Sequence, residues 1–297
     1  MTQQQDSTVE TAIEVDTSHI QRKEFDLAYS DISPSQKLDI YWPSEGNGPF
    51  PVIVSIHGGA FRFGDKRDLQ VKPMLAGLNR GYAVVSINYR MSGEAIFPAL
   101  VHDVKAAIRW VRANAATYQF DPERIAAWGG SAGGYLALML GITAKNPEME
   151  DLTLGNPDQS SSIQAVVDWF GPTDFLKMDI QFAQLDIDPA FAHNNADSPE
   201  SLLLGQQITD VPALVQVANP ETYIHSELPP FFIQHGDQDD IVPYKQSVEI
   251  TAKLSKVLGS DRVSLELLPG IGHGGPGFET DENLNKVFTF LDQALCS

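Results

Sequence analysis

The sequence predicts an α/β fold with a doubly wound, mostly parallel sheet and a small cap insertion. Short, nearly continuous apolar runs rich in β-branched residues recur along the chain, as in strands that are buried on both faces. Amphipathic segments alternate with these runs, which indicates βαβ units. The chain has 297 residues, of which 42% are hydrophobic, so it is long enough for one domain with a large core.

The predicted strands fall into two groups. The first two are separated by the turn Ser33-Pro34-Ser35 and predict an antiparallel starting edge. The later ones are apolar and predict the parallel part of the sheet. In chain order, the predicted strands cover residues 24–29, 37–42, 51–56, 83–88, 125–128, 166–170, 231–235 and 264–268.

The predicted helices lie between and after these strands. Within residues 98–118, apolar side chains such as Leu100, Val104 and Val111 recur at helical spacing, and Pro98 suits a first turn. Residues 131–143 are small and apolar throughout, as expected for a helix packed inside the fold. The predicted helices cover residues 98–118, 131–143, 244–258 and 281–295.

Residues 175–230 break this alternation. They are rich in Asp, Pro, Asn and Gln and hold only short helix-like pieces, at residues 199–204 and 211–217. A segment of this length orders many residues for little core burial, so we interpret it as a small cap beside the functional site. Polar residues 1–22 form a predicted N-terminal tail, which leaves residues 23–297 as one main domain.

Composition narrows the classes of partner. With 39 acidic and 20 basic side chains the formal net charge is −19, so we expect neither nucleic acid nor a membrane as a partner.

The single cysteine, Cys296, excludes an intrachain disulfide and a thiolate metal site. The N-terminus lacks the basic and apolar regions of a signal peptide, so a cytoplasmic location is the default expectation; a secreted mature form without its leader stays open. The oligomeric state also stays open.

One motif predicts a nucleophile. Gly129-Gly130-Ser131-Ala132-Gly133 matches the pattern Gly-x-Ser-x-Gly, directly after a predicted strand and directly before a predicted helix. This is the setting of a nucleophile elbow, a strained turn where Cβ atoms on neighbouring residues would clash and glycines are needed. The motif therefore predicts Ser131 as the nucleophile of an acyl-transfer reaction.

A second motif predicts an oxyanion hole. His57-Gly58-Gly59-Ala60-Phe61 follows the strand that ends at Ile56 and is similar to the His-Gly-Gly-Gly motif of lipases and esterases. By this similarity, the oxyanion donors are the backbone N–H groups of Gly59, Ala60 and Ala132. Ala60 stands where the motif has its third glycine, which narrows the space above its N–H. We interpret His57 as a buried side chain that holds the loop.

A third region supplies an acid and a base. Asp237, Asp239 and Asp240 follow a predicted strand, and Asp239 matches the acid of the His-Gly-x-x-Asp-x-x-Val-Pro pattern of related hydrolases. Asp237 would more naturally brace the loop, and Asp240 would point away. His273 follows in a glycine loop, and an imidazole can both accept a proton and return it. The order of Ser131, Asp239 and His273 is that of an α/β-hydrolase triad.

No motif indicates a cofactor or a metal. The chain has no His-x-x-x-His and no paired Cys/His spacing, and a serine occupies the glycine loop where a dinucleotide phosphate would approach. We therefore expect no metal, no cofactor, and a small-molecule ester as the partner. Phe61, Asp174, Phe175 and the cap are predicted to shape the substrate pocket.

From about Phe25 onward, the chain resembles the BD-FAE-like family of α/β-hydrolase-fold esterases and lipases, which includes feruloyl and acetyl xylan esterases. The motifs that carry the resemblance are Ile56-His57-Gly58-Gly59-Ala60-Phe61, Asn88-Tyr89-Arg90, Phe120-Asp121-Pro122-Glu123-Arg124-Ile125, Gly129-Gly130-Ser131-Ala132-Gly133-Gly134, Ser198-Pro199-Glu200-Ser201 and His273-Gly274-Gly275-Pro276. Phe61 stands where many relatives have tryptophan.

The resemblance implies a serine esterase that acts on short-acyl or aryl carboxylic esters through an acyl-enzyme. Two alternatives stay open. The same triad would serve an amidase or carbamate hydrolase similar to arylformamidase. A protein of this fold can also bind a partner without catalysing a reaction.

Overall fold

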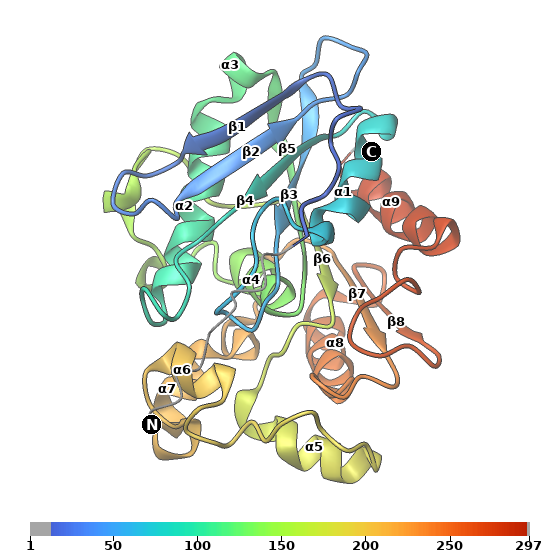
Figure 1. The fold of residues 1–297 in the computed structure, drawn as a ribbon. Helices are drawn as coiled ribbons and strands as arrows, with labels where there is room; N and C mark the ends of the chain where they lie inside the picture. The colour runs from blue at the N-terminus through green and yellow to red at the C-terminus, as the bar shows by residue number, and fades with distance from the viewer. Residues whose placement is uncertain (1–12, 296–297) are drawn as a thin grey trace, which may run out of the picture.

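The structure is a computed structural model that describes residues 13–295. Its centre is an eight-stranded sheet with the strand order β1-β2-β4-β3-β5-β6-β7-β8 (Figure 1). The strands are β1 (Lys23–Ala28), β2 (Lys37–Tyr41), β3 (Phe50–Ile56), β4 (Ala83–Ile87), β5 (Phe120–Gly130), β6 (Ala165–Trp169), β7 (Phe231–Gly236) and β8 (Val263–Leu268).

The sheet is mostly parallel, as predicted. Strand β2 pairs antiparallel with both β1 and β4, and every other neighbouring pair is parallel. The antiparallel starting edge and the parallel remainder therefore both agree with the sequence. Strand β5 is longer than the predicted residues 125–128, because Phe120 also pairs with Phe50 on β3.

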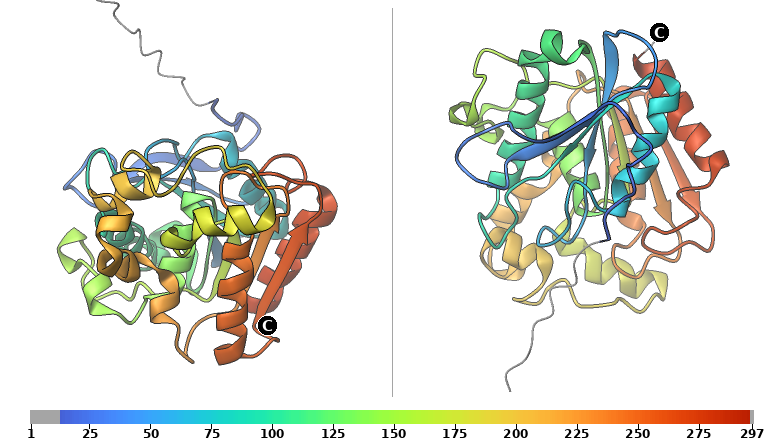
Figure 2. Two further views of the ribbon diagram at one scale, coloured as in Figure 1. Left: turned by 90° about the horizontal axis from the view of Figure 1, so that it is seen from below. Right: turned by 45° about the horizontal axis from the view of Figure 1, so that its top comes forward.

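Helices cover both faces of the sheet. The longer ones are α2 (Ala99–Ala113), α4 (Ala132–Ile142), α8 (Lys245–Leu258) and α9 (Asp281–Leu295). Figure 2 shows α8 and α9 on opposite sides of β7 and β8. Each face has its own hydrophobic core, and residues of one strand alternate between them: Val52 and Val54 pack into one core and Ile53 into the other. This alternation explains why the strands are apolar throughout.

The helices differ from the prediction at two places. Residues 98–118 form α2 and then a short α3 (Ala115–Tyr118), because Asn114 leaves helical geometry and its side-chain Nδ2 donates to the carbonyl of Trp110. Between β3 and β4 lies a helical stretch that the sequence pattern does not predict. It consists of the 3₁₀ turn Leu69–Val71, α1 (Lys72–Leu75) and the 3₁₀ turn Ala76–Arg80, none of which is long enough to show clear helical periodicity.

The predicted insertion at residues 175–230 holds three short helices, α5 (Met178–Leu185), α6 (Pro199–Leu204) and α7 (Pro212–Ala218). Figure 1 shows α5 at the bottom of the view and α6 and α7 to its left, on the side of the sheet to which the arrowhead of β6 points.

Part of the predicted tail at residues 1–22 packs against the domain. Ile20 is buried, and the N–H of Val15 donates to the carbonyl of Arg67 at 2.8 Å. Residues 1–12 and the single cysteine, Cys296, lie outside the described residues. Between residues 13 and 295, no helix is both long and apolar enough to cross a bilayer.

Candidate active site

The turn between β5 and α4 carries Ser131 at the carboxyl edge of the sheet. Ser131 has φ 57° and ψ −123°, a conformation that L-residues rarely adopt. The neighbouring glycines are sterically required. A Cβ on Gly133 would overlap the carbonyl oxygen of Ile56, and one on Gly129 would overlap that of Gly133. The close approach of β3, β5 and α4 thus forces the serine onto a tight turn, for the reason that the motif predicts.

Three side chains meet in one relay. The Oγ of Ser131 lies 2.9 Å from Nε2 of His273, and Nδ1 of His273 lies 2.7 Å from Oδ2 of Asp239. His273 comes from the loop after β8 and Asp239 from the loop after β7. Because Nδ1 faces a carboxylate, we assign the ring proton to Nδ1, which leaves Nε2 free to accept the serine proton.

Asp239 is held rigidly in the ionised state. Its side chain is fully buried, and Oδ1 accepts the backbone N–H groups of Ile241 and Val242, both at 2.8 Å. Burial opposes ionisation, but hydrogen bonds from His235 and His273 outweigh it and hold the pKa of Asp239 well below its usual range. The carboxylate is therefore charged and fixed in position for His273.

The two other aspartates of this loop have the roles that the sequence suggests. Oδ1 of Asp237 accepts the N–H of Gly270 at 2.7 Å and so joins the loop after β7 to the loop after β8. The Asp240 side chain is exposed, and its carbonyl accepts the N–H of Ala190 from the insertion at 2.8 Å. Neither carboxylate contacts His273.

The loop after β3 directs two N–H groups through fixed carbonyls. Nδ1 of His57 contacts the carbonyl of Gly58 at 2.8 Å. The carbonyl of Gly59 accepts the N–H groups of Arg62 and Phe63, both at 2.9 Å. In a trans peptide the C=O and the next N–H point in opposite directions, so these bonds orient the N–H groups of Gly59 and Ala60. Both residues line the pocket that contains Ser131.

Beside the N–H groups of Gly59 and Ala60, a third predicted oxyanion donor is the N–H of Ala132. Ala132 is the first residue of α4, where the helix provides no acceptor for a backbone N–H.

The ring of His57 is neutral, because burial lowers its pKa, and its Nδ1 carries the proton toward the carbonyl of Gly58. The ring also stacks on Tyr89 with centroids 4.6 Å apart. His57 therefore holds the loop, as interpreted from the sequence.

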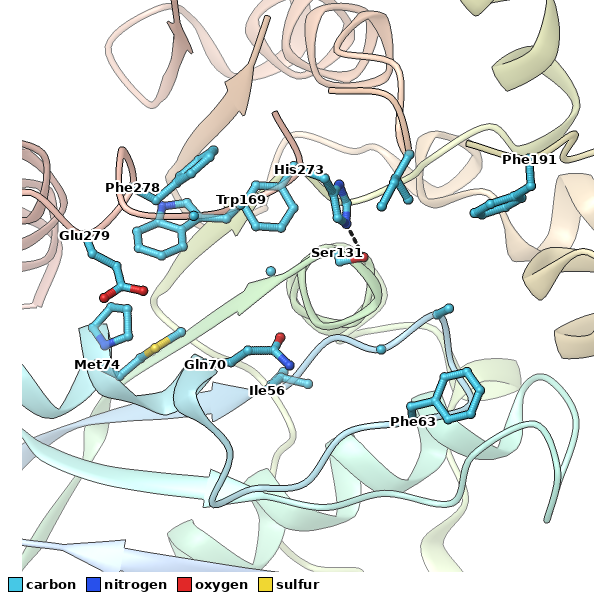
Figure 3. Close-up of a pocket in the computed structure, with 18 residues that line it drawn as sticks. Ile56, Phe63, Gln70, Met74, Ser131, Trp169, Phe191, His273, Phe278 and Glu279 are labelled. Carbon is cyan, nitrogen blue, oxygen red and sulfur yellow. Dashed lines mark hydrogen bonds between the residues drawn. The ribbon is translucent and has the colours of Figure 1, made fainter. Parts of the chain in front are cut away.

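A cavity of about 460 Å³ surrounds Ser131 and His273. In Figure 3, Phe63 and Phe191 lie on one side of these two residues, and Met74, Trp169, Phe278 and Glu279 lie on the other. The walls are largely apolar, with Gln70 and Glu279 as polar exceptions. Among residues 13–295, no group of three or more His, Cys, Asp or Glu side chains is arranged to hold a metal ion.

The three side chains predicted to shape this pocket lie elsewhere, which corrects the prediction. Phe61 and Phe175 are each 1% exposed and pack on Tyr135, at centroid distances of 5.4 Å and 5.5 Å. Asp174 lies in a separate depression, with Lys177 3.3 Å from its carboxylate. The backbone of Phe61 has a positive φ of 61°, and its side chain points into the core. Phe63, two residues later, lines the pocket instead.

Several pocket residues were missed, and only some had a sequence signal. Phe170 directly follows β6, and Phe278 follows the glycine loop of His273. Both positions lie near the ends of predicted elements that carry the site. Phe191 lies in the irregular insertion, and Gln70 lies in the helical stretch that was not predicted.

The BD-FAE family model matches residues 38–254. Among curated proteins, Esterase LipQ of Mycobacterium tuberculosis is 33% identical over 251 residues, which cover 84% of this chain and 56% of LipQ. The probable carboxylic ester hydrolase LipM of the same organism is 32% identical over 82% of this chain and 54% of LipM. The chain thus spans little more than half the length of these relatives.

Solved structures show the same fold. A truncated carbohydrate esterase from gut microbiota superposes with a TM-score of 0.85 at 31% identity, covering 96% of this chain and all of the other. Esterase 2 of Thermogutta terrifontis, phosphonylated by sarin, superposes with a TM-score of 0.74 at 25% identity, covering 92% of this chain and 95% of the other.

Proposed function

The chain belongs to the BD-FAE family, and from this membership we propose that it hydrolyses short-acyl or aryl carboxylic esters with Ser131 as the nucleophile. The named esterases among its relatives and structural neighbours support a carboxylic ester hydrolase. The observation that carries the proposal is the unbroken relay from Ser131 through His273 to Asp239 inside one pocket.

In the first half of the reaction, Nε2 of His273 takes the proton of the Ser131 hydroxyl while Oγ forms a bond to the ester carbonyl carbon. The carbonyl π electrons move to the oxygen. The N–H groups of Gly59, Ala60 and Ala132 then donate hydrogen bonds to this oxyanion. His273 then returns its proton to the alcohol oxygen as the C–O bond breaks, which leaves an acyl-enzyme and a free alcohol.

In the second half, water attacks the acyl carbon. His273 accepts the proton of the water and then gives it to Oγ of Ser131, so that the carboxylic acid leaves and the enzyme is restored. Asp239 stays ionised throughout and stabilises the imidazolium that forms in each half. Each oxyanion donor would contribute about 3 kcal/mol of transition-state stabilisation.

The pocket favours uncharged substrates. Its walls are formed mostly by aromatic and aliphatic side chains, and the chain carries a net charge of −19, which disfavours anionic esters. One structural neighbour is named a carbohydrate esterase. This name supports acylated carbohydrates as candidate substrates beside simple aryl esters.

The test uses p-nitrophenyl esters from acetate to decanoate, methyl ferulate, and anilides matched to the esters. We expect turnover of the short esters, and loss of all but a trace with Ser131→Ala. Ser264→Ala removes an exposed hydroxyl outside the pocket and should leave the rate unchanged.

A fluorophosphonate probe separates the alternatives that the sequence left open. Labelling of Ser131, located by mass spectrometry, supports a serine hydrolase, and faster cleavage of anilides than of esters would assign amidase activity instead. A folded protein that neither turns over the panel nor reacts with the probe would exclude the proposal in favour of a binding protein.

A further inference from the structure

Gln70 lies on the pocket wall, in the 3₁₀ turn that precedes α1 (Figure 3). The turn is fixed by Asp68, whose Oδ1 accepts the backbone N–H of Gln70 at 2.9 Å. Asp68 is itself 7% exposed. The backbone of Gln70 is therefore anchored independently of the pocket.

The side chain of Gln70 connects this turn to the loop after β3. Its Oε1 accepts the N–H of Gly58 at 2.7 Å, and its Nε2 donates to Oδ2 of Asp68 at 2.9 Å. Because a carboxylate can only accept, Asp68 determines which end of the amide is the nitrogen. The oxygen of Gln70 must then face Gly58.

This contact completes the restraint of the His57–Gly58 peptide. The carbonyl of His57 accepts the hydroxyl of Tyr89 at 2.9 Å, and the N–H of the same peptide donates to Gln70. The fit is close, since a Cβ on Gly58 would lie 2.9 Å from Oε1 of Gln70. Both ends of the peptide are thus held by side chains.

The restraint matters because Gly59, as a glycine, has more backbone freedom than any other residue type. Gly59 has φ 117°, a conformation that only glycine adopts without strain. Rotation about the Gly58 backbone would turn the N–H of Gly59 away from the pocket. A buried Gly58 N–H without an acceptor would favour such a rotation.

We propose that Gln70 is a positioning residue, which fixes the oxyanion loop through the N–H of Gly58 and so aims the N–H of Gly59 at the substrate carbonyl. The inference rests on the proposed esterase function, and it predicts that Gln70 acts on kcat more than on KM. Gln70 needs no contact with the substrate for this role.

The test compares Gln70→Met with Gln164→Met. Methionine keeps the length of the side chain but replaces the amide oxygen by a thioether, which is only a weak acceptor for the Gly58 N–H. Gln164 makes the same kind of bond outside the pocket, where its Oε1 accepts the N–H of Ile125 at 2.9 Å. We expect kcat to fall about tenfold in Gln70→Met, with KM within a factor of about two and little change in kcat for Gln164→Met.

A reciprocal exchange serves as the rescue. Combining Gln70→Glu with Asp68→Asn keeps an acceptor at position 70 and a donor at position 68. We expect this double variant to recover most of the lost kcat. A Gln70→Met variant with wild-type kcat, or a double variant as slow as Gln70→Met, would overturn the inference.

Hydrogen exchange gives a readout that does not depend on activity. Backbone amides of residues 57–64 should exchange faster in Gln70→Met than in the wild type, and at the wild-type rate in Gln164→Met. If no variant hydrolyses esters but this loop loses protection, the proposed function fails while the positioning of the loop holds. Unchanged protection in Gln70→Met contradicts the inference whatever the activity.

Discussion

The imidazoles of His235 and His273 approach the same oxygen of Asp239. Nε2 of His235 lies 3.1 Å and Nδ1 of His273 lies 2.7 Å from Oδ2. The His235 ring is fully buried, with Nδ1 2.7 Å from the hydroxyl of Ser247 and Nε2 2.8 Å from the carbonyl of Val242. One histidine thus fixes the acid from the protein side while the other connects it to Ser131.

This arrangement predicts different effects for two neighbouring aspartates. Asp239→Asn removes the charge that orients His273 and stabilises its protonated form, so kcat should fall by about three to four orders of magnitude. Asp237→Asn alters the contacts of this side chain with Gly270 and Gln238, neither of which lies in the relay, and should keep kcat within about threefold. Steady-state kinetics on p-nitrophenyl acetate measures both, and a larger loss in Asp237→Asn would assign the acid to that residue.

A methyl group on Gly59 should disable the oxyanion loop. A Cβ there would overlap the carbonyl of Phe63, and φ is 117°. We expect Gly59→Ala to lower kcat about 100-fold or more, as for the loss of one oxyanion donor. Gly81 is the control, since φ is 83° and a Cβ would meet nothing within 4 Å. If Gly81→Ala lowers kcat as much as Gly59→Ala, general backbone strain is the cause.

The buried carboxyl group of Asp168 should make the folded protein less stable as the pH rises. It is fully buried at the end of β6, its Oδ1 accepts the N–H of Gly171 at 3.0 Å, and its Oδ2 has no partner among the described residues. Burial raises its pKa from 3.8 to about 7. Ionisation is therefore easier in the unfolded chain, so stability falls as the pH rises from about 4 to about 7 and stays reduced above that.

Asp168→Asn removes this effect. Its gain in free energy of unfolding over the wild type should be about 3 kcal/mol larger at pH 8 than at pH 5. Urea denaturation at both pH values measures the difference. Asp158 is exposed, so Asp158→Asn should show the same effect at both pH values. An equal gain for Asp168→Asn at pH 5 and pH 8 would falsify the assignment.

The two aromatic rings at the pocket mouth should select for ring-bearing esters. Phe63 is 62% and Phe191 is 36% exposed, and covering such apolar surface favours binding. Phe63→Ala should raise KM for naphthyl acetate about fivefold but hardly alter KM for ethyl acetate. Leu152 is also exposed but lies outside the pocket, so Leu152→Ala should affect neither. A uniform change for both esters would exclude this role.

Much of the candidate site was predictable because its residues follow strands directly. Ser131 comes one residue after β5, and His57 one residue after β3. Parallel strands place such positions at one edge of the sheet, whatever the length of chain between them. Other parts of the pocket wall follow no such rule. Phe191 comes from an irregular insertion, and Gln70 contributes through a hydrogen bond with Gly58 that no local pattern encodes.

The sequence by itself determined the sheet, because continuous apolar strands can be buried only between two layers of helices. It also determined the turn at Ser131, because only glycine fits two residues before and two residues after it. The tertiary structure alone decided which side chains line the pocket around Ser131. Phe61 and Phe63 are two residues apart, yet one is buried and the other lines the pocket. Their directions depend on the backbone of a loop whose conformation is set by contacts with residues outside it, namely Tyr89, Gln70 and the helix after Ser131.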